Sequence, residues 1–204
     1  MEKHKPDYYD NLEKTYLKIW SLLESGLKNR DAPFHIPVFI CSYKDESDGR
    51  IIVLRGVDKK EKKIRFHTDI RSNKVKFLKS NSSGALLFYD KIEKIQLRVL
   101  GNTKINYQNK ITENSWKKTA HMSRQCYLGQ KPPGSDYFEP TSGLSNDIDN
   151  FNFTIEDSEI GYKNFCVIDF FIESVEWLYL AAKGHRRAFF RLEKNIVKKK
   201  WLIP

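Results

Sequence analysis

The chain has 204 residues, of which 40% are hydrophobic and 13% aromatic, and this composition excludes an intrinsically disordered chain. Its length suits a single domain over residues 1–204, and no apolar run approaches the roughly 20 residues that a membrane-spanning helix needs. Residues 1–6 are charged and lack the apolar core of a signal peptide, so we expect a cytoplasmic protein without a membrane partner.

The net charge of +10 is unevenly distributed along the chain. Residues 131–160 hold one lysine against seven acids, a net of −6, so the remainder carries +16. A basic balance can indicate nucleic-acid binding, but the sequence contains no recognised nucleic-acid-binding motif. We therefore keep a non-enzymatic basic binding module only as a minor alternative.

The three cysteines, Cys41, Cys126 and Cys166, are far apart and form no CxxC pair. Such a sparse, odd set argues against a disulfide framework and against a zinc site. We expect each cysteine to be a small buried hydrophobic residue, and we assign no metal ligand.

Apolar residues first recur at spacings of three and four, which predicts an amphipathic helix over residues 8–28 within an N-terminal segment 1–30. Asp48-Gly49 is a turn signal, and it predicts a hairpin between strands 38–43 and 50–57. Ser72 is a candidate N-cap for a helix over residues 71–79. The remaining patterns predict strands at 64–67, 85–89, 95–106, 165–171, 175–180, 187–192 and 199–203, helices at 112–122 and 123–128, and a long acidic loop at 130–162. Seven or eight short strands with few helices indicate a mainly β protein, an antiparallel barrel with peripheral helices.

Basic and hydroxyl side chains gather at the ends of these strands between Arg50 and Gly101. Arg50, Arg55 and Lys74 supply positive charge, and Thr68 and Ser72 supply hydroxyl groups. Arginine binds phosphate with paired, charge-assisted hydrogen bonds, and the free N–H groups at a helix start favour an anion. The pattern therefore predicts a pocket for a phosphorylated ligand.

Six motifs then follow one another along the chain: R-I-I-V-L-R-G-V-D, F-H-T-D-I-R-S-N-K, A-L-L-F-Y-D, Q-L-R-V-L-G, W-L-Y-L-A-A-K-G-H-R-R-A-F-F and W-L-I-P. In this order and spacing they resemble the pyridoxamine 5′-phosphate oxidase-like flavoproteins over residues 33–204. The resemblance implies the FMN-binding split-barrel fold, a Greek-key-type barrel of six strands. It also implies FMN as the cofactor and a homodimer that binds FMN at the subunit interface.

The resemblance further implies which residues contact the cofactor. Asn73 stands where the family often has an arginine, and Arg187 matches an arginine given by the second subunit. The complete implied set is Arg50, Ile51, Ile52, Val53, Leu54, Arg55, His67, Thr68, Ser72, Asn73, Lys74, Gln96, Ser142 and Arg187.

Substrate contacts follow less closely, because the segments that hold the substrate phosphate in the family differ here. The candidates are Arg55, Arg124, Tyr127, Lys183 and His185. The implied reaction is that of a pyridoxamine or pyridoxine 5′-phosphate oxidase, hydride transfer from a small substrate to FMN with O₂ as acceptor. The alternative is an FMN-dependent reductase that uses an external nicotinamide or deazaflavin donor. The sequence singles out no catalytic acid or base.

Overall fold

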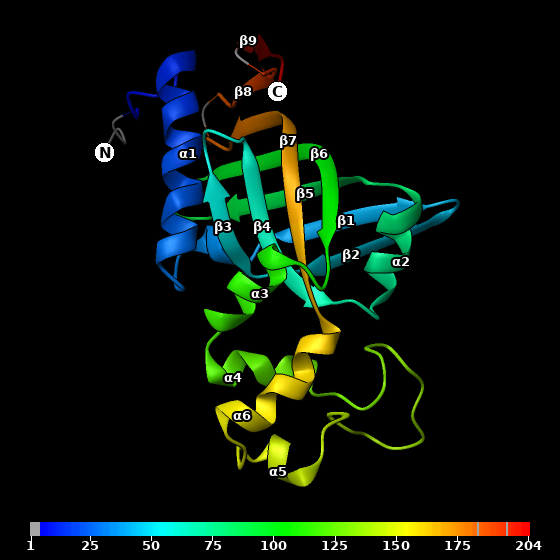
Figure 1. The fold of residues 1–204 in the computed structure, drawn as a ribbon. Coiled ribbons are helices and arrows are strands. Elements are labelled where there is room, and N and C mark those ends of the chain that lie inside the picture. Colours follow the sequence, from blue (N-terminus) through cyan, green and yellow to red (C-terminus); the bar gives the residue numbers. More distant parts are fainter. Residues whose placement is uncertain (1–4, 183, 195) are drawn as a thin grey trace.

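The computed structural model describes residues 5–182, 184–194 and 196–204. Its nine strands form one antiparallel sheet in the order β2-β1-β5-β6-β7-β4-β3, with β8 paired to β7 and β9 to β8 (Figure 1). No pairing among the described strands closes this sheet into a ring. The strands are β1 (Val38–Tyr43), β2 (Glu46–Ile51), β3 (Leu54–Asp58), β4 (Lys63–Asp69), β5 (Ser83–Asp90), β6 (Ile95–Asn106), β7 (Phe165–Tyr179), β8 (Arg186–Leu192) and β9 (Val197–Leu202).

The helices lie around this sheet, so the predicted mainly β architecture with peripheral helices is confirmed. α1 runs along one side, while α3 to α6 gather below the sheet in the view of Figure 1. The α-helices are α1 (Leu12–Lys28), α2 (Asn73–Ser80), α3 (Lys110–Lys117), α4 (His121–Arg124), α5 (Asn146–Asp149) and α6 (Ile155–Ser158), and the 3₁₀ helices are η1 (Pro33–His35), η2 (Gln125–Tyr127) and η3 (Glu159–Asn164).

α1 begins four residues later than the pattern predicted. Residues 7–10 form a turn, and the Asn11 side chain caps the helix by accepting a hydrogen bond from the Lys14 amide at 3.1 Å. The helix buries Ile19, Trp20 and Leu23 against the sheet. Its apolar face therefore joins the main core, as its periodicity predicted.

The predicted turn at Asp48-Gly49 is wrong. Both residues lie inside β2, and the turn lies at Lys44-Asp45, where Lys44 has a positive φ of 52°. The predicted strand 50–57 is also divided, because the chain leaves β1 after Ile51 and pairs with β4 from Leu54 onward. This crossing places residues 51–55 at a junction between two parts of the sheet.

β7 is one continuous strand of 15 residues rather than the two strands predicted. The register of the β6–β7 pairing shifts between Leu100 and Gly101 of β6, and the two strands stay paired on both sides of this shift. A Cβ atom on Gly101 would lie only 2.0 Å from the Phe171 carbonyl oxygen, and glycine is needed at this close approach. β7 consequently pairs with β4 along its first half and with β8 along its second half.

The main core fills the space between the sheet and α1. A smaller cluster of Trp116, Tyr127, Phe165 and Val167 joins the region of α3 to η3 to the start of β7. Cys41 and Cys166 are buried as predicted, but the expectation for Cys126 is wrong, because it is exposed. Among the described residues, no helix is long and apolar enough to cross a membrane.

Candidate functional site

A buried lysine forms the centre of an anion cradle at the start of α2. The Nζ atom of Lys74 donates to the Oγ1 atom of Thr68 at 2.7 Å and lies 3.3 Å from the Oγ atom of Ser72. Thr68 lies at the end of β4, and Ser72 occupies the N-cap position of α2. All three residues are buried. An ammonium group, two hydroxyls and a helix start together match the chemistry of a phosphate group.

Burial, and after it the nearby Arg50 guanidinium, lower the pKa of Lys74 from 10.5 to about 8. Asp48 acts in the opposite direction, and this carboxylate forms an ion pair with Arg50. The cradle therefore has a cation that titrates close to neutral pH and that a bound phosphate dianion would keep protonated.

The cradle opens into a cavity of about 690 Å³. One wall comes from residues 51–55, the end of β4 and the start of α2, and the other comes from residues 119–133. Eight of the predicted cofactor residues line it: Ile51, Ile52, Val53, Arg55, His67, Thr68, Ser72 and Lys74. This volume lies within the range typical of cofactor sites.

Four other predicted cofactor residues lie outside this lining. Arg50 pairs with Asp48 next to the cradle, and Leu54 is 1% exposed in the main core. Asn73 is exposed in the first turn of α2, and Ser142 is exposed in the loop that follows η2.

His67 is a neutral group in a basic environment. Burial, and after it the charges of Arg55 and Arg65, lower its pKa from 6.5 to about 3. Its ring lies 4.8 Å from the ring of Phe165 in an edge-on contact. At neutral pH the imidazole therefore offers the cavity one acceptor nitrogen and one N–H donor.

Gln96 and Arg187 lie in a different part of the sheet, on either side of Leu178 in β7. The Nη2 atom of Arg187 donates to Glu176 at 2.8 Å, while its buried Nε atom has no hydrogen-bond partner among the described residues. Thr68 pairs with Cys166, twelve residues before Leu178 on the same strand. At about 3.3 Å per residue, roughly 40 Å of strand separates the two groups.

The candidate substrate residues also lie in different parts of the structure. Arg55 and Tyr127 line the cavity, whereas His185 is exposed and does not, and Lys183 lies outside the described residues. Arg124 is 5% exposed and binds elsewhere. Its guanidinium donates to Glu159 at 2.5 Å, to Ser158 at 3.1 Å and to the Trp116 carbonyl at 3.1 Å. In this arrangement Arg124 stabilises the packing of α3 against α6.

A second compartment of about 350 Å³ adjoins the first. Arg30, Arg55 and Lys118 line it, and no carboxylate in the described part of the chain forms an ion pair with any of the three. Arg65 also lines it but is paired with Asp169 at 2.7 Å. Sequence reasoning missed Arg30, Arg65 and Lys118, since each reads as an ordinary surface charge.

Residues 20–107 match the family model described as pyridoxamine 5′-phosphate oxidase, FMN-binding domain. This part of the chain is similar to that FMN-binding domain. The matched residues include the Lys74 cradle and the strands that line the main cavity. No curated protein sequence matches the chain.

Three solved structures share the fold at low sequence identity. A pyridoxamine 5′-phosphate oxidase-related, FMN-binding protein from Nostoc punctiforme is 15% identical, with a TM-score of 0.73 over 99% of this chain and 100% of that one. PhzG from Burkholderia lata, solved with tetrahydrophenazine-1-carboxylic acid, is 18% identical, with a TM-score of 0.73 over 100% of this chain and 99% of that one. A pyridoxamine 5′-phosphate oxidase-type protein from Listeria innocua is 16% identical, with a TM-score of 0.51 over 81% of this chain and 99% of that one.

Proposed function

We propose that the protein is an FMN-dependent oxidoreductase that oxidises a small anionic substrate, in the manner of a pyridoxamine or pyridoxine 5′-phosphate oxidase. The observation that carries this proposal is the basic compartment beside the cofactor cavity. The two spaces share Arg30, Arg55 and His67 in their lining, so a ligand in one can reach the other. A substrate whose anionic group is held in the smaller space would extend its reacting part into the larger one.

The cradle residues would hold the cofactor by its phosphate. Lys74, Thr68 and Ser72 would bind that group, and residues 51–53 with His67 would line the remainder of the cofactor. The chemistry that FMN supplies when bound is acceptance of a hydride from the substrate, with O₂ taking the electrons afterwards.

The side chains of this site would bind the substrate and orient it. Arg30, Arg55 and Lys118 would hold the substrate anion, because no carboxylate among the described residues forms an ion pair with any of these charged donors. Neutral His67 adds an acceptor between the two spaces without adding charge. Hydride transfer requires no protein acid or base, and positioning is the main contribution that we assign to these residues.

The distance along β7 supports a homodimer with FMN at the subunit interface. Gln96 and Arg187 lie too far along the strand from Thr68 for one chain to bring both groups to one cofactor. A two-fold interface would place the Arg187 of one chain next to the Lys74 cradle of the other. The unpartnered Nε atom of Arg187 would then find an acceptor there.

The anionic group of the substrate is a phosphate or a carboxylate. The experiment that tests the proposal loads the purified protein with FMN and measures peroxide release with pyridoxamine 5′-phosphate and pyridoxine 5′-phosphate. Unphosphorylated pyridoxamine and an aromatic carboxylic acid of the kind bound to PhzG are the comparisons. Turnover that depends on the anionic group supports the proposal. Absence of peroxide with every anionic compound, with reduction of the flavin by a nicotinamide or deazaflavin donor, would favour a reductase instead.

A further inference from the structure

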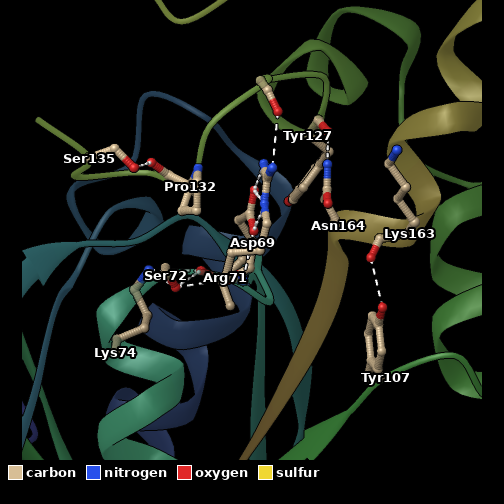
Figure 2. A network of polar contacts seen from close by, with 12 residues as sticks. Asp69, Arg71, Ser72, Lys74, Tyr107, Tyr127, Pro132, Ser135, Lys163 and Asn164 are labelled. Atoms are coloured by element: carbon tan, nitrogen blue, oxygen red, sulfur yellow. Dashed lines mark hydrogen bonds and ion pairs between the residues drawn. The ribbon is translucent and has the colours of Figure 1, made fainter. Parts of the chain in front are cut away.

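We propose that Arg71 is a positioning residue that ties the outer wall of the cofactor cavity to the phosphate cradle. This inference rests on the cofactor placement proposed above. Figure 2 shows the network that carries it: Asp69 and Arg71 lie between the cradle residues Ser72 and Lys74 and the segment that contains Tyr127.

The first link runs through the guanidinium of Arg71. Its Nη2 and Nε atoms donate to the two carboxylate oxygens of Asp69, at 2.7 Å and 3.0 Å. Its Nη1 atom donates to the carbonyl oxygen of Gly129 at 3.1 Å. One planar group therefore bridges the turn before α2 and the end of the wall segment 119–133, with its fork held rigidly by the buried Asp69.

A second link runs from the same turn through Asn164. The amide of Ile70 donates to the Asn164 carbonyl at 2.9 Å, and the Asn164 side chain donates to the Tyr127 carbonyl at 2.8 Å. Asn164 is buried, so water does not compete strongly for these hydrogen bonds. Two carbonyls of the wall, at Tyr127 and Gly129, are thus held from residues 69–71.

Arg71 also cancels an unfavourable charge. Asp69 lines the cavity beside the cradle, where a free carboxylate would repel a phosphate. The bidentate pair with Arg71 neutralises it. Although Arg71 lies two residues before Asn73, it does not replace the family's phosphate-binding arginine, because its described hydrogen bonds all go to Asp69 and Gly129.

The placement of the wall and the binding of the cofactor phosphate are therefore coupled through one turn of the chain. A wall released from Gly129 would move Tyr127, which lines the cavity. Cofactor binding in turn would stabilise the turn and protect the wall amides from hydrogen exchange.

The test compares Arg71→Gln with the wild-type protein in two substrate-free measurements, the FMN dissociation constant and amide hydrogen exchange over residues 126–130. We expect about tenfold weaker FMN binding, from the lost charge-assisted bonds, and faster exchange in the wall even with FMN bound. Arg71→Lys, which keeps the charge and loses the fork, should show the faster exchange with a smaller loss of affinity.

Two further variants separate positioning from general stability. Tyr107→Phe is the matched control, because it removes a side-chain bond of 2.8 Å to the Lys163 carbonyl next to Asn164 but touches neither cradle nor cavity. Adding Asp69→Asn to Arg71→Gln should restore part of the FMN affinity while exchange in the wall stays fast. An Arg71→Gln protein that matches Tyr107→Phe in both measurements overturns the inference. Unchanged FMN affinity in Lys74→Ala would instead contradict the cofactor placement on which it rests.

Discussion

The Nζ atom of Lys74 lies 2.7 Å from the Oγ1 atom of Thr68, and both buried side chains line the main cavity. Six residues along the chain separate them, and the turn between β4 and α2 brings them together. This contact concentrates positive charge and hydroxyl groups at one place, and it makes the affinity for a phosphate sensitive to the protonation of a single lysine.

FMN affinity should therefore fall at alkaline pH. Because burial and Arg50 lower the pKa of Lys74 to about 8, the lysine is charged below that pH and loses its proton above it. A phosphate dianion binds the charged form, so the dissociation constant should rise up to roughly tenfold between about pH 7 and pH 9. Titration by quenching of FMN fluorescence measures this. Lys74→Arg, which stays charged, should flatten the dependence, and an equally steep dependence in that variant would contradict the assignment.

His67 should make the protein less stable in weak acid. Its pKa is about 3 in the folded protein against 6.5 for an ordinary histidine, so between these values the unfolded chain binds a proton that the folded chain does not. Stability is full above pH 6.5 and should fall by about 1.4 kcal/mol for each pH unit below it. Urea unfolding at several pH values measures the slope. His67→Gln should reduce the slope by that amount, and an unchanged slope would show that other groups cause it.

Gly101→Ala should destabilise the fold severely. The added methyl group would meet the Phe171 carbonyl oxygen at 2.0 Å, so the β6–β7 pairing must shift, at a cost of roughly 3 kcal/mol or more. Gly49→Ala is the control, because the nearest atom to its new Cβ is a side-chain carbon of Ile40 at 3.9 Å. Thermal or urea unfolding compares the two, and equal losses would refute the role given to the close approach at Gly101.

The basic compartment should determine the Michaelis constant rather than cofactor binding. Arg30→Gln and Lys118→Gln each remove one charged donor from that space, so KM for an anionic substrate should rise about tenfold. In Lys118→Gln the FMN dissociation constant should change little, because Lys118 lines the basic compartment but not the larger cavity. Lys117→Gln removes a neighbouring charge outside the compartment and serves as the control. If Lys117→Gln and Lys118→Gln raise KM equally, general surface charge and not the compartment determines substrate binding.

Two defective chains should repair each other if the cofactor lies between subunits. Lys74→Ala removes the phosphate half of a site, and Arg187→Ala removes the half that we assign to the partner. A mixed dimer then contains one site with both halves intact and one with neither. Refolding the two variants together should restore high-affinity FMN binding to a fraction of the sites, and each variant alone should not recover it. Absence of any restoration in mixed dimers would argue that Arg187 does not act across an interface.

The sequence predicted regular strands and compact motifs well. β1 and β6 have the predicted bounds. In β6, apolar and polar residues alternate from Ile95 to Val99, and this pattern is typical of a strand. The Asp48-Gly49 turn was wrong, since the pairing of Val38 with Ile51 leaves only Lys44-Asp45 to connect the strands. A turn signal is local, whereas the register depends on the whole pair of strands.

The residues of the candidate site differ in the same respect, because some are close in the sequence and others come together only in the folded chain. Residues 67–74 were predicted as a group because the motif keeps them close in the sequence. Arg30 and Lys118 come together only in the folded chain, and no local pattern distinguishes them from other surface charges. Arg124 shows the opposite case, since its cationic side chain suggested a ligand contact but its hydrogen bonds hold α3 and α6 together.

The uninterrupted course of β7 has a genetic consequence. In a two-fold dimer, each copy of this strand would serve one cofactor with its beginning and the other with its end. A substitution that spoiled both ends would damage every dimer it entered. With equal amounts of altered and normal chains, only about a quarter of the sites would stay intact, so such a change would behave as partially dominant.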